Sequence, residues 1–201
     1  MKKIFTFITA FLMVGTMAMA QYQVGDYATD FKLKNIDGKY VSLADNPNNK
    51  GYLVIFTCNH CPYSKMYEDR IIALDKKYKA MGYPVVAINP NDPEAQPEDS
   101  FENMKIRAKE KGFTFPYLVD ETQEITKTYG ATRTPHVFLL TKERDRYKVA
   151  YIGAIDNNHQ DASKATERYV EMAMTDVMAG KSVRQNFTKA IGCTIKWKAE
   201  D

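Results

Sequence analysis

The chain has 201 residues, of which 44% are hydrophobic and 26% charged, an ordinary balance for one globular domain. Its formal net charge is +3, and two lysines near the N-terminus account for most of that excess. These values exclude a largely disordered or collagen-like chain, and they give no general electrostatic reason to bind nucleic acid.

The first twenty residues have the pattern of an export signal. Two lysines precede an uncharged apolar run that ends at residues 18–20 in Ala-Met-Ala, which provides the small residues that signal peptidase reads. A membrane anchor is the alternative, but the apolar run is shorter than the roughly 20 residues that a span requires. We expect a signal peptide over residues 1–20 and a soluble periplasmic or otherwise extracytoplasmic protein from Gln21.

The mature chain opens with a hairpin pattern. Residues 31–33 and 40–43 alternate apolar and polar side chains, and Asp37-Gly38 between them favours a tight turn. Residues 52–57 (YLVIFT) and 83–89 (YPVVAIN) are continuous apolar runs, typical of strands buried on both faces of a sheet.

Helical periodicity follows between and after these strands. It predicts helices after Pro62, after Ser100, through Ile125 to Tyr129 with a capping box of Asp120 and Gln123, and from about Asp161 to Ala179. Further strands are expected at 115–119, 136–140 and 148–152.

The order of these elements predicts an α/β fold with a central mixed sheet, helices on both faces and an added N-terminal hairpin. We expect this domain to span residues 21–180, with a C-terminal extension over 181–201.

Cys58 and Cys61 are two residues apart where a buried strand passes into a helix. The N-terminus of a helix stabilises a thiolate, and cysteines in such motifs have pKa values of roughly 3.5–7.5. We therefore expect Cys58 to be the attacking thiolate and Cys61 the resolving thiol. A protonated His60 beside Cys58 would stabilise the thiolate further.

Metal binding is a weaker interpretation of the pair. A structural zinc site needs four ligands, and the chain has no second close pair of cysteines. Covalent haem attachment needs a histidine directly after Cys61, where Pro62 stands instead. We expect neither a cofactor nor a metal.

The motif Cys58-Asn59-His60-Cys61-Pro62, together with Thr134-Pro135 before a strand, resembles the thioredoxin superfamily. The resemblance implies a thioredoxin-like fold in which Pro135 is cis and packs beside the cysteines. It also implies that Thr134 contacts the backbone of the substrate.

The resemblance extends along the chain to the redoxin branch of that superfamily, which includes AhpC/TSA-type peroxiredoxins and TlpA-like and ResA-like reductases. The segments FTCNHCPY, PEDSFENM, FPYLVDETQ and GCTIKW are similar to those of peroxiredoxin-like exported members. Two departures matter: Tyr52 stands about where thioredoxin has a buried aspartate that accepts a proton, and the peroxiredoxin pattern Pro-x-x-x-Thr-x-x-Cys is absent around Cys58.

Two further residues are candidates for the site. Arg133 would stabilise a Cys58 thiolate if it lay nearby, or it is a solvated loop residue. Cys193 is either a third redox thiol, paired with a cysteine of the motif or with a partner, or a buried inert thiol.

The leading hypothesis is an exported thiol–disulfide oxidoreductase that exchanges disulfides with client proteins and is recharged by a redox partner, which could be membrane-bound. The alternatives are a thiol-dependent peroxidase and a copper-handling protein of the Sco type, in which Cys58, Cys61 and His136 would be the ligands.

Overall fold

The computed structural model describes residues 21–199, so the expected signal peptide lies outside the described residues. Its main sheet has eight strands in the order β1-β9-β8-β4-β5-β6-β2-β3, and β10 and β7 form a second, two-stranded sheet. The strands are β1 (Tyr27–Ala28), β2 (Leu33–Asn35), β3 (Tyr40–Val41), β4 (Gly51–Phe56), β5 (Val85–Asn89), β6 (Tyr117–Val119), β7 (Arg133–Thr134), β8 (His136–Glu143), β9 (Arg146–Gly153) and β10 (Cys193–Thr194).

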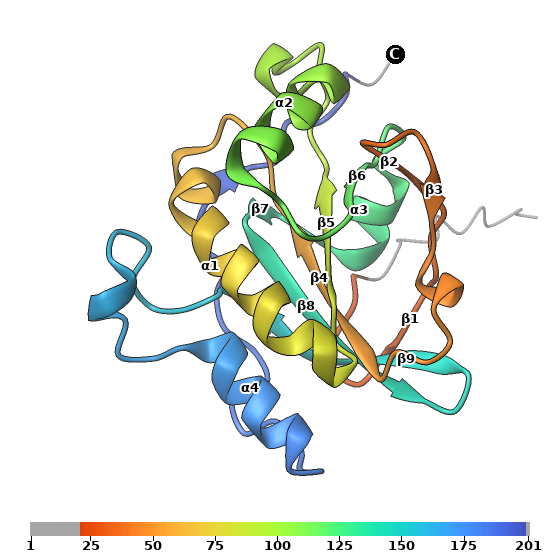
Figure 1. Cartoon of the computed structure of the whole chain (residues 1–201), viewed down its shortest axis with the longest axis vertical. Coiled ribbons are helices and arrows are strands. Elements are labelled where there is room, and N and C mark those ends of the chain that lie inside the picture. Colours follow the sequence, from red (N-terminus) through yellow and green to blue (C-terminus); the bar gives the residue numbers. More distant parts are fainter. Residues whose placement is uncertain (1–20, 200–201) are drawn as a thin grey trace, which may run out of the picture.

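Four α-helices pack around the main sheet (Figure 1). They are α1 (Pro62–Tyr78), α2 (Phe101–Lys111), α3 (Glu124–Tyr129) and α4 (Tyr169–Met178). None of the described helices is both long enough and apolar enough to cross a membrane.

The centre of the sheet is parallel and its margins are antiparallel. β4, β5 and β6 run parallel, β8 pairs antiparallel with β4, and the predicted hairpin of β2 and β3 adds to β6. Every residue of β4 and β5 is buried, as expected for central strands covered on both faces. The expected mixed α/β sheet with an added hairpin is therefore confirmed.

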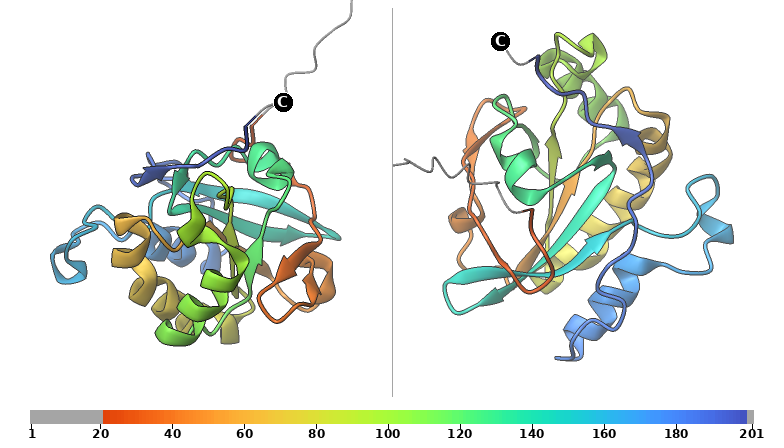
Figure 2. Two further views of the ribbon diagram at one scale, coloured as in Figure 1. Left: turned by 90° about the horizontal axis from the view of Figure 1, so that it is seen from above. Right: turned by 180° about the vertical axis from the view of Figure 1, so that it is seen from behind.

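Alternation along β4 divides the core into two layers. Leu53 and Ile55 pack with side chains of α1, α2 and α4, whereas Val54 and Phe56 pack on the other face with Tyr129 of α3. Figure 2 shows α3 and the N-terminal segment on the face opposite α1 and α4.

The last helix begins later than the periodicity predicts, at Tyr169 rather than near Asp161. The side-chain oxygen of Asn157 accepts the backbone N–H groups of Thr166 and Glu167, at 3.1 and 3.2 Å. Such side-chain to backbone bonds compete with helix formation, so this segment is a loop.

The capping box expected before α3 is also wrong. Gln123 has a left-handed backbone (φ 59°) and makes no capping bond, while Asp120 accepts both the N–H and the hydroxyl of Thr126.

The residues after 180 return along the main domain. Thr188 donates its N–H to the carbonyl of Ile152, and further on β10 pairs antiparallel with β7 (Figure 2, right). The expected extension thus covers one edge of the domain, and it brings Cys193 to the cysteine motif.

Candidate active site

Three strand ends place the predicted site residues at one edge of the sheet. β4 and β5 are parallel, so the cysteine motif after β4 and the loop after β5 emerge side by side. β8 runs the other way, and its first residue, His136, is opposite Phe56 at the end of β4. Thr134-Pro135 consequently lies beside the cysteines, and this peptide bond is cis, as the resemblance implies.

Cys58 is a free and buried thiol in this structure. Its Sγ lies 3.2 Å from Oγ1 of Thr134, 3.6 Å from Nδ1 of His60 and 3.8 Å from Oγ of Ser64. Thr134, expected from the resemblance to contact the substrate, therefore directly contacts the cysteine expected to attack.

The expected low pKa of Cys58 is wrong for this state. Burial, and after it the negative charge of Asp99, raise the pKa of the thiol, which lies at about 11. Hydrogen bonds from Thr134, from the backbone of Cys61 and from Ser64 lower it, but by less. Cys61 is the N-cap of α1, so the helix end does contribute, yet desolvation of the charged form outweighs it.

Asp99 organises the turn that carries the cysteines. Its buried carboxylate accepts the backbone N–H groups of Asn59 and His60 at 2.7 and 3.1 Å. It also accepts Nδ1–H of His60 at 2.5 Å and the side-chain amide of Asn91 at 2.6 Å. The carboxylate thus fixes both central residues of the motif and the imidazole next to Cys58.

Sequence reasoning missed Asp99. The residue follows Pro97 in a loop that the sequence marks only as proline-rich and acidic, and its role depends on where that loop returns. The parallel pairing of β4 and β5 does indicate that this loop lies near the cysteine motif, because it brings the segments that follow both strands to the same edge of the sheet.

Cys61 forms a disulfide with Cys193, with 6.0 Å between the Cα atoms. Of the two interpretations of Cys193, the inert thiol is therefore wrong, and this structure has the alternative in which Cys193 pairs with a cysteine of the motif. The sulfur of Cys61 also lies 3.3 Å from the carbonyl oxygen of Thr134, so Cys58 and Cys61 both contact the same residue.

Arg133 and His136 flank the cis peptide, and neither is among the hydrogen-bond partners of Cys58 in the described residues. Arg133 is half-buried in β7, and its side chain makes no hydrogen bond or ion pair with the described residues, so its influence on Cys58 remains a prediction. His136 is buried, which lowers its pKa to about 4, and its Nδ1 accepts the N–H of Thr132.

The copper-ligand set of Cys58, Cys61 and His136 does not assemble in this state, because Cys61 is held in the disulfide. Among residues 21–199, the group able to hold a metal ion is Cys58, His60 and Asp99, whose ligand atoms lie within 4.8 Å of one another. In this structure His60 and Asp99 are hydrogen-bonded to each other. Tyr52, at the position of thioredoxin's aspartate, donates its hydroxyl to the carbonyl of Leu43.

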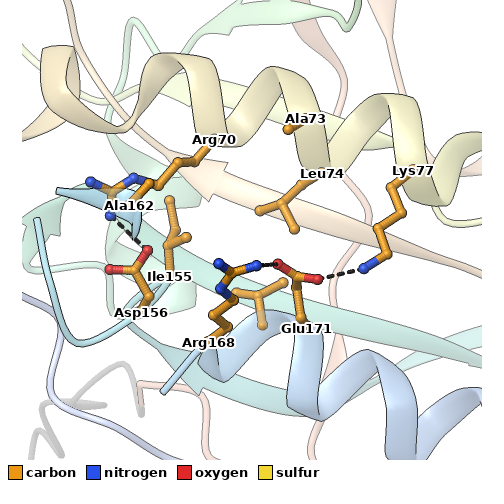
Figure 3. Close-up of a pocket in the computed structure, with 10 residues that line it drawn as sticks. Arg70, Ala73, Leu74, Lys77, Ile155, Asp156, Ala162, Arg168 and Glu171 are labelled. Carbon is orange, nitrogen blue, oxygen red and sulfur yellow. Dashed lines mark hydrogen bonds and ion pairs between the residues drawn. The ribbon is translucent and has the colours of Figure 1, made fainter. Parts of the chain in front are cut away.

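A separate cavity of about 210 Å³ lies between α1 and α4 (Figure 3). Its charged side chains pair with one another: Arg70 with Asp156 at 2.6 Å, and Glu171 with both Lys77 and Arg168. None of the three cysteines lines this cavity, so it is not part of the thiol site.

Comparison with known proteins links the site to redox enzymes. The model of the AhpC/TSA family matches residues 24–152. A thiol-disulfide oxidoreductase ResA from Halalkalibacterium halodurans is 24% identical over 145 residues, which are 72% of this chain and 76% of that protein.

Solved structures extend the comparison to the whole fold. A conserved uncharacterized protein from Geobacillus kaustophilus is 38% identical, with a TM-score of 0.82 over 90% of this chain and 95% of its own. A putative thiol:disulfide interchange protein DsbE from Chlorobium tepidum is 26% identical, with a TM-score of 0.52 over 65% of this chain and 84% of its own.

Proposed function

The chain belongs to the AhpC/TSA family, and we propose that it is an exported enzyme that exchanges disulfides with cysteine-containing client proteins. Its thioredoxin fold and its ResA relatives place it among the thiol–disulfide oxidoreductases. The observation that carries the proposal is the unpaired Cys58, which lies beside Cys61 at the start of α1 and 3.2 Å from Thr134.

Each residue around the pair has a defined task. Cys58 attacks a client disulfide and forms a mixed disulfide, and Cys61 attacks the sulfur of Cys58 to release the reduced client. Thr134 and Pro135 offer the backbone edge on which the client lies, and an extended client segment would bind there by strand addition. His60 is held by Asp99 and modulates the ionisation of Cys58 from 3.6 Å away.

Asp99 is the proton acceptor that the sequence leaves unassigned. It is a buried carboxylate that reaches within 4.8 Å of the Cys58 sulfur and is hydrogen-bonded to the adjacent imidazole. Its charge favours the neutral thiol at rest, and the same charge makes it a base for the thiol proton when the attack begins.

Export and the cellular partner complete the proposal. The pattern of residues 1–20 supports export to an oxidising compartment, where disulfide exchange has substrates. Similarity to ResA supports action as a reductant, with a separate redox partner that returns the enzyme to its reduced form.

Turnover of a disulfide substrate tests this function. Cys58→Ser should abolish the reduction of insulin by the enzyme in the presence of dithiothreitol, whereas Thr122→Ser, an exposed substitution, should leave the rate unchanged. Titration in glutathione buffers should give one potential for the reactive pair, within about −270 to −120 mV.

Two results would replace the proposal. Insulin reduction by Cys58→Ser at the parent rate would remove Cys58 from the mechanism. Rapid consumption of hydrogen peroxide that needs Cys58 alone, without insulin reduction, would identify a peroxidase instead.

A further inference from the structure

The C-terminal strap, which we define as residues 190–198, occupies the backbone edge assigned above to the client. Cys193 pairs with Thr134 and Thr194 with Arg133, in antiparallel register. A client that binds by strand addition would make this same kind of pairing. The strap and a client therefore compete for one surface.

Gly192 permits the close approach of the strap. A Cβ atom at this position would lie 2.1 Å from the carbonyl oxygen of Thr134 and 3.1 Å from the nitrogen of Pro135. Since these are backbone atoms, they cannot move aside as a flexible side chain could.

Hydrogen bonds hold the strap beyond the disulfide. The buried amide of Gln123 donates to the carbonyl of Lys196 at 2.9 Å and accepts the N–H of Lys198 at 2.8 Å. Asn91 accepts the N–H of Lys196 at 2.9 Å, and its own amide donates to Asp99. Asn91 therefore links the strap directly to the carboxylate beneath the cysteine motif.

We propose that Cys193 is a third catalytic thiol, which replaces Cys58 as the disulfide partner of Cys61. The new disulfide latches the strap over the backbone edge of Thr134 and Pro135 on which the client would lie. The proposal rests on the function assigned above and names the step that follows client reduction. Cys61 is the shared sulfur, bonded to Cys58 while the strap is free and to Cys193 while the strap is latched.

The exchange balances without any outside reagent. The thiolate of Cys193 attacks the sulfur of Cys61, the Cys61–Cys193 bond forms, and the Cys58–Cys61 bond breaks. The electron pair of the broken bond leaves on Cys58, which takes up the proton that Cys193 gave up. The number of disulfides is unchanged. Cys61 stays oxidised, and its disulfide partner changes from buried Cys58 to half-buried Cys193.

The observed state is the expected end point of this exchange. Cys58 is a free thiol close to Thr134, His60 and Ser64, so the attacking thiol is available again while the disulfide is held between Cys61 and the strap. The redox partner would then reduce Cys61–Cys193, and only that step would free the strap for another client.

Peptide mapping after a single turnover tests the relay. Fully reduced protein is mixed with one equivalent of oxidised glutathione, quenched with acid, alkylated and cleaved with trypsin. Cys58 and Cys61 both fall in the peptide 51–65, and Cys193 falls in 190–196. The parent protein should first show an internal disulfide in 51–65 and then the cross-linked pair of peptides, with Cys58 alkylated.

The variants separate the steps. Cys193→Ser should stop at the internal disulfide, and Cys58→Ser should form the cross-link at least tenfold more slowly than the parent. A parent protein that ends with the internal disulfide would overturn the relay, and so would a Cys58→Ser variant that forms the cross-link at the parent rate.

A second measurement tests the relay without a substrate. Protein isolated with Cys61–Cys193 is incubated at pH 9 without external thiol, and a detectable fraction should isomerise to the internal disulfide. Failure to isomerise would overturn the relay whatever glutathione does. Isomerisation without any reduction of glutathione would overturn the proposed function alone.

Hydrogen exchange tests the latch. The amides of 190–196 should exchange at least tenfold faster in Cys61→Ser than in the latched parent protein, because that variant lacks the disulfide. Equal protection in both would show that the disulfide does not govern the strap.

Discussion

Asp99 and His60 are hydrogen-bonded to each other beside the reactive cysteine, with 2.5 Å between Oδ2 and Nδ1. The same carboxylate holds two backbone N–H groups of the motif. This one side chain therefore sets both the shape of the cysteine turn and the local charge.

Asp99→Asn should separate these two effects. Removing the negative charge should lower the pKa of Cys58, so the thiol should titrate at a lower pH than in the parent protein. Loss of the proton acceptor should lower the rate of insulin reduction by about 100-fold. Asp145→Asn, an exposed substitution, is the matched control. A parent-like rate combined with a parent-like thiol titration would exclude Asp99 from both roles.

The reactivity of Cys58 in the latched state should depend steeply on pH. Its pKa of about 11 leaves the thiol neutral at pH 7, so the rate of alkylation by iodoacetamide should rise about tenfold per pH unit from pH 7 to 10. Mass spectrometry of the peptide 51–65 would follow the reaction, with the unfolded protein as reference. A midpoint below pH 8 would contradict the burial argument.

The central elements of this fold are predictable because their signal is local. The apolar runs at 52–57 and 83–89 become β4 and β5, and Asp37-Gly38 becomes the turn between β2 and β3. The burial of each strand is encoded in its own residues.

The missed features depend on contacts that no local pattern encodes. β10 has only two residues, so it has no periodicity that the sequence could reveal. Its pairing with β7 is a contact between segments about 60 residues apart in the chain. The pKa of Cys58 could not be predicted for the same reason. The motif predicts a helix end that lowers the pKa, whereas packing of distant segments buries the sulfur and raises it.

Gly192→Ala should displace the strap. The added methyl group would meet the Thr134 carbonyl at 2.1 Å, so β10 should separate from β7. We expect the cross-linked peptide to form at least tenfold more slowly after oxidation, and the amides of 190–196 to exchange faster. Lys189→Arg, an exposed change beside the strap that keeps the trypsin site before Ala190, is the control. Unchanged cross-linking in Gly192→Ala would show that the close approach is not required.

His136 should make stability depend on pH. Burial lowers its pKa from 6.5 to about 4. Between pH 4 and 6.5 this histidine is therefore protonated in the unfolded chain and neutral in the folded protein. The stabilisation is fully present above pH 6.5 and is lost progressively as the pH falls to 4, by up to about 3 kcal/mol.

Urea unfolding at several pH values would measure this contribution. In His136→Gln the free energy of unfolding should change less with pH between pH 6.5 and 4, although the substitution itself lowers stability at neutral pH. His159→Gln is the control, because its histidine lies half-exposed in a loop and should leave the slope unchanged. If the slope of His136→Gln equals that of the parent protein, another group is responsible for the acid sensitivity.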